Sequence, residues 1–126
     1  MPDSDAPTVE FLEAYGEAWN DHDADRIMAA MTDDCIFETG GGESPWGDRH
    51  EGAAAVRARV EEVWRDIPDV SFDDARHFVS GDRGCSEWVL RGTRTDGKTV
   101  DVAGCDLFTF RDGKILVKSS FLKNRR

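Results

Sequence analysis

The stretch DVAGCDLFTFRDGKILVKSSFL, residues 101–122, constrains the fold of this chain more than any other segment. Two mainly apolar runs flank Asp112-Gly113, a dipeptide that strongly favours a tight turn, so the segment predicts a β-hairpin. Side chains alternate between the two faces of a strand, and Asp106 therefore shares a face with Phe108 and Phe110. A carboxylate with so few polar neighbours points to a functional site.

Composition favours one domain and excludes several classes of partner. The chain has 126 residues, 39% of them hydrophobic, which suits a single domain over residues 1–126. Its net charge of -10 repels nucleic acid and anionic lipid, so we expect neither as a partner. The apolar runs are too short to span a membrane and the first residues do not resemble a secretory signal, so we expect a cytoplasmic protein.

The cysteines and histidines give no sign of a metal site or a disulfide framework. The three cysteines and three histidines are scattered along the chain without the spacing of metal ligands. Phosphate-binding loops and dinucleotide fingerprints are also absent from the sequence. We therefore predict no metal and no cofactor.

Hydrophobic periodicity predicts helices in the first half of the chain and strands in the second. Apolar residues at helical spacing indicate helices at about 8–20, 23–32 and 52–67. Strands are indicated at 35–39, 70–79, 85–95, 99–111 and 114–122. A glycine-rich loop over 40–47 carries Trp46, which we expect to cover a cavity mouth. This order predicts an α+β fold, a cone-shaped roll in which a curved antiparallel sheet wraps around three N-terminal helices.

The turn at Asp96-Gly97 sets which residues of the preceding strand face the cavity. A two-residue turn there pairs Glu87 with Asp106, and two adjacent carboxylates would share a proton or require a nearby base. Val89 and Arg91 then lie on the same face as Glu87. The opposite face would be too apolar to leave in water, and we interpret it as a homodimer interface formed by Trp88, Leu90, Cys105 and Leu107.

The second turn leaves two alternatives for the last strand. A three-residue loop over 111–113 places Lys118 opposite Asp106 and also turns Ser120 and Leu122 into the cavity. A two-residue turn instead brings the odd-numbered residues of that strand inward. With the first loop, Lys118 is part of an acid/base group with the carboxylates; the alternative is a lysine that faces solvent.

Several segments resemble the nuclear transport factor 2-like superfamily, which includes the SnoaL-like polyketide cyclases and the ketosteroid isomerases. They are the opening helical hairpin with Tyr15, TDDCIFE at 32–38, GAAAVR at 52–57 and CDLFTFRDGKI at 105–115. The resemblance covers nearly the whole chain and favours the three-residue loop. It implies that Tyr15 and Asp106 are the hydrogen-bond donors of an oxyanion hole.

The resemblance also places Thr39 where the ketosteroid isomerases carry their general-base aspartate. A threonine hydroxyl has no useful basicity near neutral pH, so Lys118 or Glu87 would have to move the proton. Asp106 itself has two interpretations. It is either an acid kept neutral by desolvation, which donates a hydrogen bond to an enolate oxygen, or a carboxylate paired with a cation, with Tyr15 as a core residue.

We therefore expect a cofactor-independent acid/base enzyme of isomerase, cyclase or dehydratase type, acting on a small, largely apolar molecule that is carbonyl-bearing or cyclic. The expected catalytic residues are Tyr15, Asp106, Lys118 and Glu87. The expected pocket residues are Trp19, Phe37, Thr39, Trp46, Val89, Arg91, Phe108, Ser120 and Leu122. One alternative is a noncatalytic ligand-binding or dimerisation module of the same fold. Another is an epoxide hydrolase, which would need a second cavity carboxylate beside an arginine; Glu87 and Arg91 are the residues that could provide it.

Overall fold

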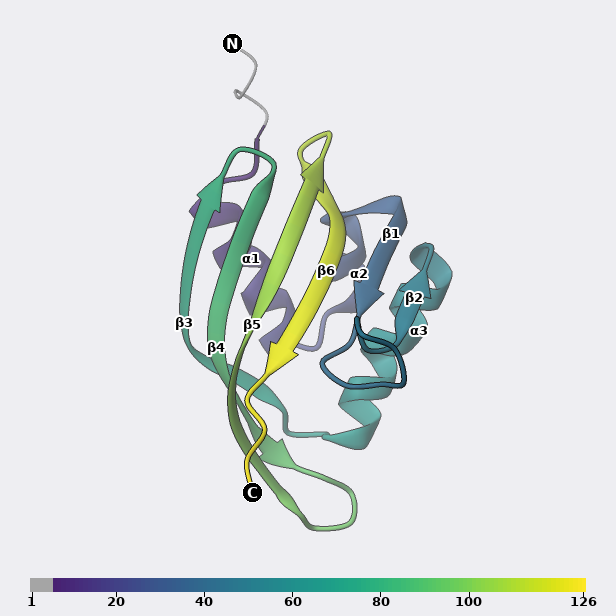
Figure 1. Ribbon diagram of the computed structural model, residues 1–126, viewed down its shortest axis with the longest axis vertical. Helices are drawn as coiled ribbons and strands as arrows, with labels where there is room; N and C mark the ends of the chain where they lie inside the picture. Colours follow the sequence, from purple (N-terminus) through teal and green to yellow (C-terminus); the bar gives the residue numbers. More distant parts are fainter. Residues whose placement is uncertain (1–5) are drawn as a thin grey trace.

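Three helices lie against one face of a curved six-stranded sheet in the computed structural model, which describes residues 6–126 (Figure 1). The helices are α1 (Val9–Asn20), α2 (Ala24–Ala29) and α3 (Ala53–Asp66). The strands are β1 (Met31–Glu38), β2 (Arg49–Glu51), β3 (Ser71–Ser80), β4 (Arg83–Thr93), β5 (Thr99–Arg111) and β6 (Lys114–Leu122). The predicted α+β cone is confirmed. One domain over 1–126 stays a prediction, and residues 1–5 lie outside the described residues.

The strands are ordered β2-β1-β6-β5-β4-β3 across the sheet. The neighbours are antiparallel except for β1 and β6, which are parallel. This parallel pair corrects the end predicted for the second helix at Thr32. Helix α2 ends at Ala29 because Met31 pairs with Ile115 of β6, and the Ile115 N–H donates to the carbonyl of Ala30 at 2.9 Å.

The core lies between the helices and the inner face of the sheet. Thr8 caps the N-terminus of helix α1, and its side chain accepts a hydrogen bond from the N–H of Phe11 at 3.2 Å. The helix buries an apolar stripe against the strands. The most completely buried large side chains come from both layers and are Leu12, Ile27, Cys35, Val56, Val60, Phe108 and Ile115. Phe108 therefore lies on the inner face, as period-two alternation predicts.

The loop between β4 and β5 has three residues, and this corrects the predicted register. Arg94 and Lys98 are joined by a hydrogen bond of 2.8 Å, and Gly97 adopts a φ of 88°, which is typical of glycine in a three-residue hairpin loop. Ser86, not Glu87, therefore lies opposite Asp106. A shift of one residue exchanges the two faces of a strand.

The exchange corrects both the pocket and the interface predicted for β4. Glu87, Val89 and Arg91 lie on the outer face, whereas Trp88 and Leu90 turn toward the helices. Of the predicted interface residues, Cys105 and Leu107 stay on the outer face. The homodimer remains a prediction, without Trp88 and Leu90 as outer-face residues.

The turn between β5 and β6 has two residues, because Asp112 and Gly113 both have positive φ, at 54° and 75°. The predicted three-residue loop was therefore wrong, but the side chains of β6 that it placed in the cavity do face inward. An irregularity in the ladder between the Phe110 and Thr109 pairs shifts the register by one residue. Lys118 and Ser120 consequently face inward, and Ser120 rather than Lys118 lies opposite Asp106.

Strand β3 carries a second irregularity that re-aims its side chains. Asp74 has a φ of 56°, and the pairing with β4 shifts between Asp73 and Arg76. Because of this bulge, Phe72 and His77 both face inward although they are an odd number of residues apart. Among the described residues, every helix falls short of the length and apolarity needed to cross a membrane.

Candidate active site

Asp106 lies at the centre of a buried polar network on the inner face of the sheet. It is 5% exposed, and its carboxylate accepts hydrogen bonds from Nε1 of Trp88 at 3.0 Å, Nζ of Lys118 at 3.0 Å and Oγ of Ser120 at 2.6 Å. All of these groups donate to the carboxylate, which is the arrangement of an ion pair. Of the two interpretations that the sequence allowed, the geometry matches the carboxylate paired with a cation.

Lys118 is the cation, and it is as buried as its partner. The residue is 4% exposed, and its Nζ also donates to Oγ of Ser120 at 3.0 Å. The ammonium lies 4.1 Å from the ring centroid of Phe37 and 4.9 Å from that of Trp19. Burial lowers the pKa of the Lys118 amine, although the charge of Asp106 acts in the opposite direction.

The network lies between two cavities of the described residues. The first, of about 210 Å³, lies between α1, β3 and β4, and we call it the α1 cavity. The second, of about 150 Å³, lies beside α3 and the ends of β1, β4 and β6, and we call it the α3 cavity. Both cavities are lined by Trp19, Phe72, Trp88 and Lys118. We call these four residues the shared wall. Among the described residues, Lys118 is the only lysine that lines either cavity.

The shared wall is built mainly from aromatic rings that meet edge to face. The ring centroids of Trp19 and Phe72 are 5.5 Å apart, and those of Phe72 and Trp88 are 5.0 Å apart. The indole N–H of Trp19 is buried and has no acceptor among the described residues. Such a donor costs about 1–3 kcal/mol when it is left unpaired, so a ligand oxygen or a water bound there would stabilise the wall.

Tyr15 lines the α1 cavity together with Asp106, but the two side chains do not bond to each other. The hydroxyl donates to the sulfur of Met31 at 3.6 Å, and the ring packs edge to face on Phe108 at 5.8 Å. Burial raises the pKa of the Tyr15 hydroxyl, which therefore stays protonated. A thioether is a weak acceptor, so the hydroxyl can be redirected to a ligand at little cost.

His77 and Ser86 are inward-facing residues that sequence reasoning did not place in the site. Nδ1 of His77 lies 2.7 Å from Oγ of Ser86, and both residues line the α1 cavity. Burial lowers the pKa of His77, so its ring is mainly neutral near pH 7. A regular alternation along β3 cannot turn both Phe72 and His77 inward, and the bulge at Asp74 that makes this possible carries no clear sequence signal.

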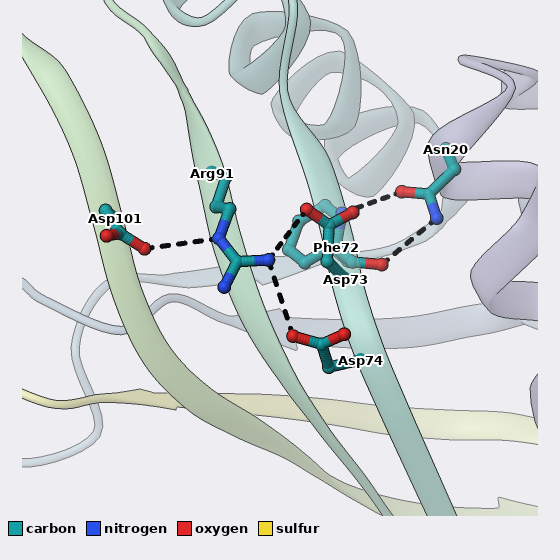
Figure 2. A network of polar contacts seen from close by, with 6 residues as sticks. All are labelled: Asn20, Phe72, Asp73, Asp74, Arg91 and Asp101. Atoms are coloured by element: carbon teal, nitrogen blue, oxygen red, sulfur yellow. Dashed lines mark hydrogen bonds and ion pairs between the residues drawn. The ribbon is translucent and has the colours of Figure 1, made fainter.

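Some predicted pocket residues lie away from both cavities. Glu87 pairs with Arg76 at 3.2 Å on the outer face, and Val89 lines a groove on that same face. Figure 2 shows Arg91 held outside by the carboxylates of Asp73, Asp74 and Asp101. The predicted cavity positions of Glu87, Val89 and Arg91 were therefore wrong, so Glu87 and Arg91 do not supply the cavity carboxylate and arginine that an epoxide hydrolase would need.

The remaining predicted pocket residues divide into two groups. Phe37, Thr39, Ser120 and Leu122 line the α3 cavity, Phe108 lines the α1 cavity and Trp19 lines both. Trp46 lines neither cavity. It is 45% exposed and stacks on the guanidinium of Arg49, whose Cζ is 4.3 Å from a ring centroid of Trp46.

Thr39 has a structural role in the loop that follows β1. Its hydroxyl donates to the carbonyl of Gly41 at 2.8 Å and accepts from the N–H of Asp48 at 3.0 Å. The Thr39 hydroxyl therefore makes its hydrogen bonds to the backbone of the loop. Within residues 6–126, no group of His, Cys, Asp and Glu side chains has an arrangement that would hold a metal ion.

The sequence matches the model of a SnoaL-like domain over residues 12–117, which is most of the chain. The chain belongs to the SnoaL-like domain family. The match includes the part of α1 that supplies Tyr15 and Trp19, and β5, which supplies Asp106. Lys118 and Ser120 follow its last matched residue. No curated protein matches the sequence of this SnoaL-like domain.

Solved structures resemble this SnoaL-like domain over most of their length. A provisionally assigned polyketide cyclase of Xanthomonas campestris pv. campestris is 23% identical, with a TM-score of 0.78, over 90% of this chain and 87% of that one. A second provisionally assigned polyketide cyclase, from Pseudomonas putida KT2440, is 22% identical with a TM-score of 0.82, over 94% and 92%. TerC, crystallised with polyporic acid, is 21% identical with a TM-score of 0.76, over 98% and 92%. At these identities, the similarity establishes the fold.

Proposed function

We propose that this SnoaL-like domain is a cofactor-independent acid/base enzyme of the isomerase or cyclase type. Its substrate would be a small, mainly apolar carbonyl compound bound against the shared wall. One observation carries the proposal, namely that the Lys118–Asp106 ion pair is buried where two cavities meet. A buried ion pair is weak support for stability, since apolar residues of similar volume often stabilise a core as well or better. A catalytic role would explain why this ion pair is buried between the two cavities.

The reaction follows from what the two side chains can do to a ketone. The ammonium of Lys118 donates a hydrogen bond to the carbonyl oxygen, and the carboxylate of Asp106 takes a proton from the neighbouring carbon. The electron pair of the broken C–H bond forms the C=C bond of an enolate, and the negative charge on its oxygen lies beside Lys118. In a β,γ-unsaturated ketone, return of the proton from Asp106 to the γ-carbon shifts the double bond and gives an isomer. Attack of the enolate carbon on a second carbonyl of the same molecule closes a ring, and the new alkoxide takes the proton from Asp106.

The other polar groups of the site hold or assist this pair. Trp88 and Ser120 keep the carboxylate in place with their hydrogen bonds, which leaves Lys118 free to reorient toward a ligand. The Tyr15 hydroxyl can donate a second hydrogen bond to a ligand in the α1 cavity. His77, mainly neutral near pH 7, can carry a proton between that cavity and solvent.

The similar structures support this class of substrate. Two of them carry a provisional assignment as polyketide cyclases, and TerC was crystallised with polyporic acid. They are related at low identity, so the choice of reaction rests on the charged pair in the present chain.

Deuterium exchange into the α-carbon of 1-indanone tests the reaction without knowledge of the natural substrate. The wild-type protein should exchange the α-protons faster than buffer, as followed by proton NMR in D₂O. Asp106→Asn and Lys118→Met should each lower the protein-catalysed rate about 100-fold, which is the usual size of a general acid/base contribution. Asp101→Asn on β5 and Lys114→Met on β6 are matched controls, because both residues are exposed on the same strands. Equal rates in all four variants would refute the proposal.

The second candidate function is a noncatalytic binding module for the same type of ligand. The observation in its favour is that Asp106 is neutralised by Lys118, whose Nζ lies 3.0 Å from its carboxylate. Binding of 1-indanone to the wild-type protein without any exchange above buffer would support this candidate over the enzyme.

A further inference from the structure

The two cavities carry opposite charges at their edges. The lining of the α1 cavity includes the carboxylates of Glu13 and Glu17. The lining of the α3 cavity includes the guanidinium groups of Arg59 and Arg94, together with the carboxylate of Asp66. The Lys118 of this lining is paired with Asp106, which leaves two arginines against one aspartate. In a chain of net charge -10, such a cavity attracts anions that the rest of the surface repels.

Arg94 is an exposed cation of the α3 cavity without a partner in the described chain. It lies at the turn that joins β4 to β5, and its backbone N–H and carbonyl are used by the turn. Within residues 6–126, its guanidinium makes no ion pair and no side-chain hydrogen bond. All of its side-chain donors are therefore available to a ligand.

Arg59 lies on α3 and contributes to the same lining. Its side chain is 24% exposed, and Nη1 contacts Glu62 at 3.3 Å, which leaves its other nitrogens free of ion pairs with the described residues. The charge of Arg59 also reaches the shared wall, where it adds to burial in lowering the pKa of Lys118. Arg59 and Lys118 line the same cavity, so an anion bound there would interact with both charges.

We propose that the α3 cavity binds the carboxylate end of a monocyclic organic acid, with the acid group on Arg94 and Arg59 and the ring toward Phe37 and Trp19. A guanidinium matches a carboxylate with two parallel hydrogen bonds, which fixes the orientation of the ligand. A cavity of about 150 Å³ has the size that accepts a benzene ring. Asp66 weakens the attraction, but within the lining it is one carboxylate against two guanidinium groups.

This inference names the substrate class of the proposed function and rests on it for the reaction. A ligand held in this way places its ring against the shared wall. A carbonyl on the far side of that ring then points at Lys118, whose partner Asp106 lines the α1 cavity on the other side of the shared wall. The substrate would thus be a keto acid with the two groups on opposite sides of the ring.

Binding of three small probes tests the inference. Benzoate, benzyl alcohol and benzylamine share one ring and differ in charge, and their dissociation constants can be measured by chemical-shift titration in low salt. Benzoate should bind about tenfold more tightly than benzyl alcohol, which corresponds to 1.4 kcal/mol. Benzylamine should bind more weakly than either, because the cations of the lining repel it.

Arginine variants locate the site. Arg94→Gln and Arg59→Gln should each weaken benzoate binding about fivefold, as expected for loss of one partly exposed charge-assisted contact, and leave benzyl alcohol binding unchanged. Arg65→Gln is the matched control, since Arg65 is exposed on α3 and lies outside the lining. Thermal unfolding of each variant shows whether it is folded.

Two results would overturn the inference: benzoate binding that neither arginine variant weakens, or benzylamine binding as tight as that of benzoate. Failure of this inference and failure of the proposed function are distinguishable. If the exchange rate of 1-indanone depends on Asp106 and benzoate binding does not depend on Arg94, the proposed function is supported and the carboxylate site is refuted. If benzoate binding depends on Arg94 and the protein catalyses no exchange, the carboxylate site is supported and the proposed function is refuted.

Discussion

Removal of one partner of the Lys118–Asp106 ion pair is the perturbation whose energetic result follows most directly from the structure. Lys118→Met leaves the carboxylate of Asp106 buried with two of its donors, Trp88 and Ser120. Asp106→Asn leaves the ammonium buried with Ser120 and the faces of two aromatic rings. Each single variant therefore has an uncompensated charge in the interior, whereas the double variant has none.

The size of the effect can be estimated from the partners that remain. Breaking a buried pair by removing one side chain costs about 3–5 kcal/mol, and we expect the lower end because each remaining charge keeps some hydrogen bonds. Two independent losses would add up to about 6 kcal/mol for the double variant. The double variant should instead lose about 3–4 kcal/mol, which gives a coupling of about 2–3 kcal/mol.

Urea unfolding of the wild type, both single variants and the double variant measures this coupling as a double-mutant cycle. The matched control is the same cycle on Arg111 and Asp34, an ion pair with both side chains exposed. The control pair should show a much smaller coupling, since water solvates each partner when the other is removed. A coupling for Lys118 and Asp106 no larger than that of the control would refute the reasoning that this charge pair is buried.

Three further predictions concern titration and reactivity. Because burial lowers the pKa of His77 from 6.5, the unfolded state binds more protons than the folded state just below that pH. The free energy of unfolding should therefore fall on acidification, and it should fall less steeply in His77→Gln. Urea unfolding at several pH values measures this, and the same dependence on pH in both proteins would contradict it. The Lys118 pKa is also lowered, so the wild type should gain stability relative to Lys118→Met as pH rises toward 10.5, and a loss would reverse the sign. Burial raises the pKa of Cys85 to about 11, so its thiol should react with Ellman's reagent at pH 8 far more slowly in the native protein than in urea; similar rates would show an accessible thiol.

The limits of the last two strands could be predicted closely because the alternation of side chains is visible in their sequence. Strands β5 and β6 have the predicted limits, and Asp106 shares the inner face with Phe108 and Phe110. Polar and apolar residues alternate there, and Asp112-Gly113 marks the turn. The inward direction of Lys118 was one of two stated alternatives, and the structure reaches it through a bulge rather than through a longer loop.

The rest of the site depended on backbone irregularities that the sequence does not signal. One additional loop residue before Lys98 turned Trp88 inward and Glu87 outward, which exchanged a pocket residue for an interface residue. The bulge at Asp74 turned His77 inward in the same way. Strand faces have a period of two, so a single uncertain residue in a turn or bulge reverses every assignment beyond it.

A crystal structure of the protein soaked with 1-indanone tests the central claim most directly, because it locates the ketone relative to the charged pair. We predict that the ketone lies against the shared wall, with its oxygen about 3 Å from Nζ of Lys118 and its α-carbon beside the carboxylate of Asp106. A ketone bound with its oxygen away from Lys118, or a Lys118 side chain that faces solvent while Asp106 is unpaired, would contradict the account.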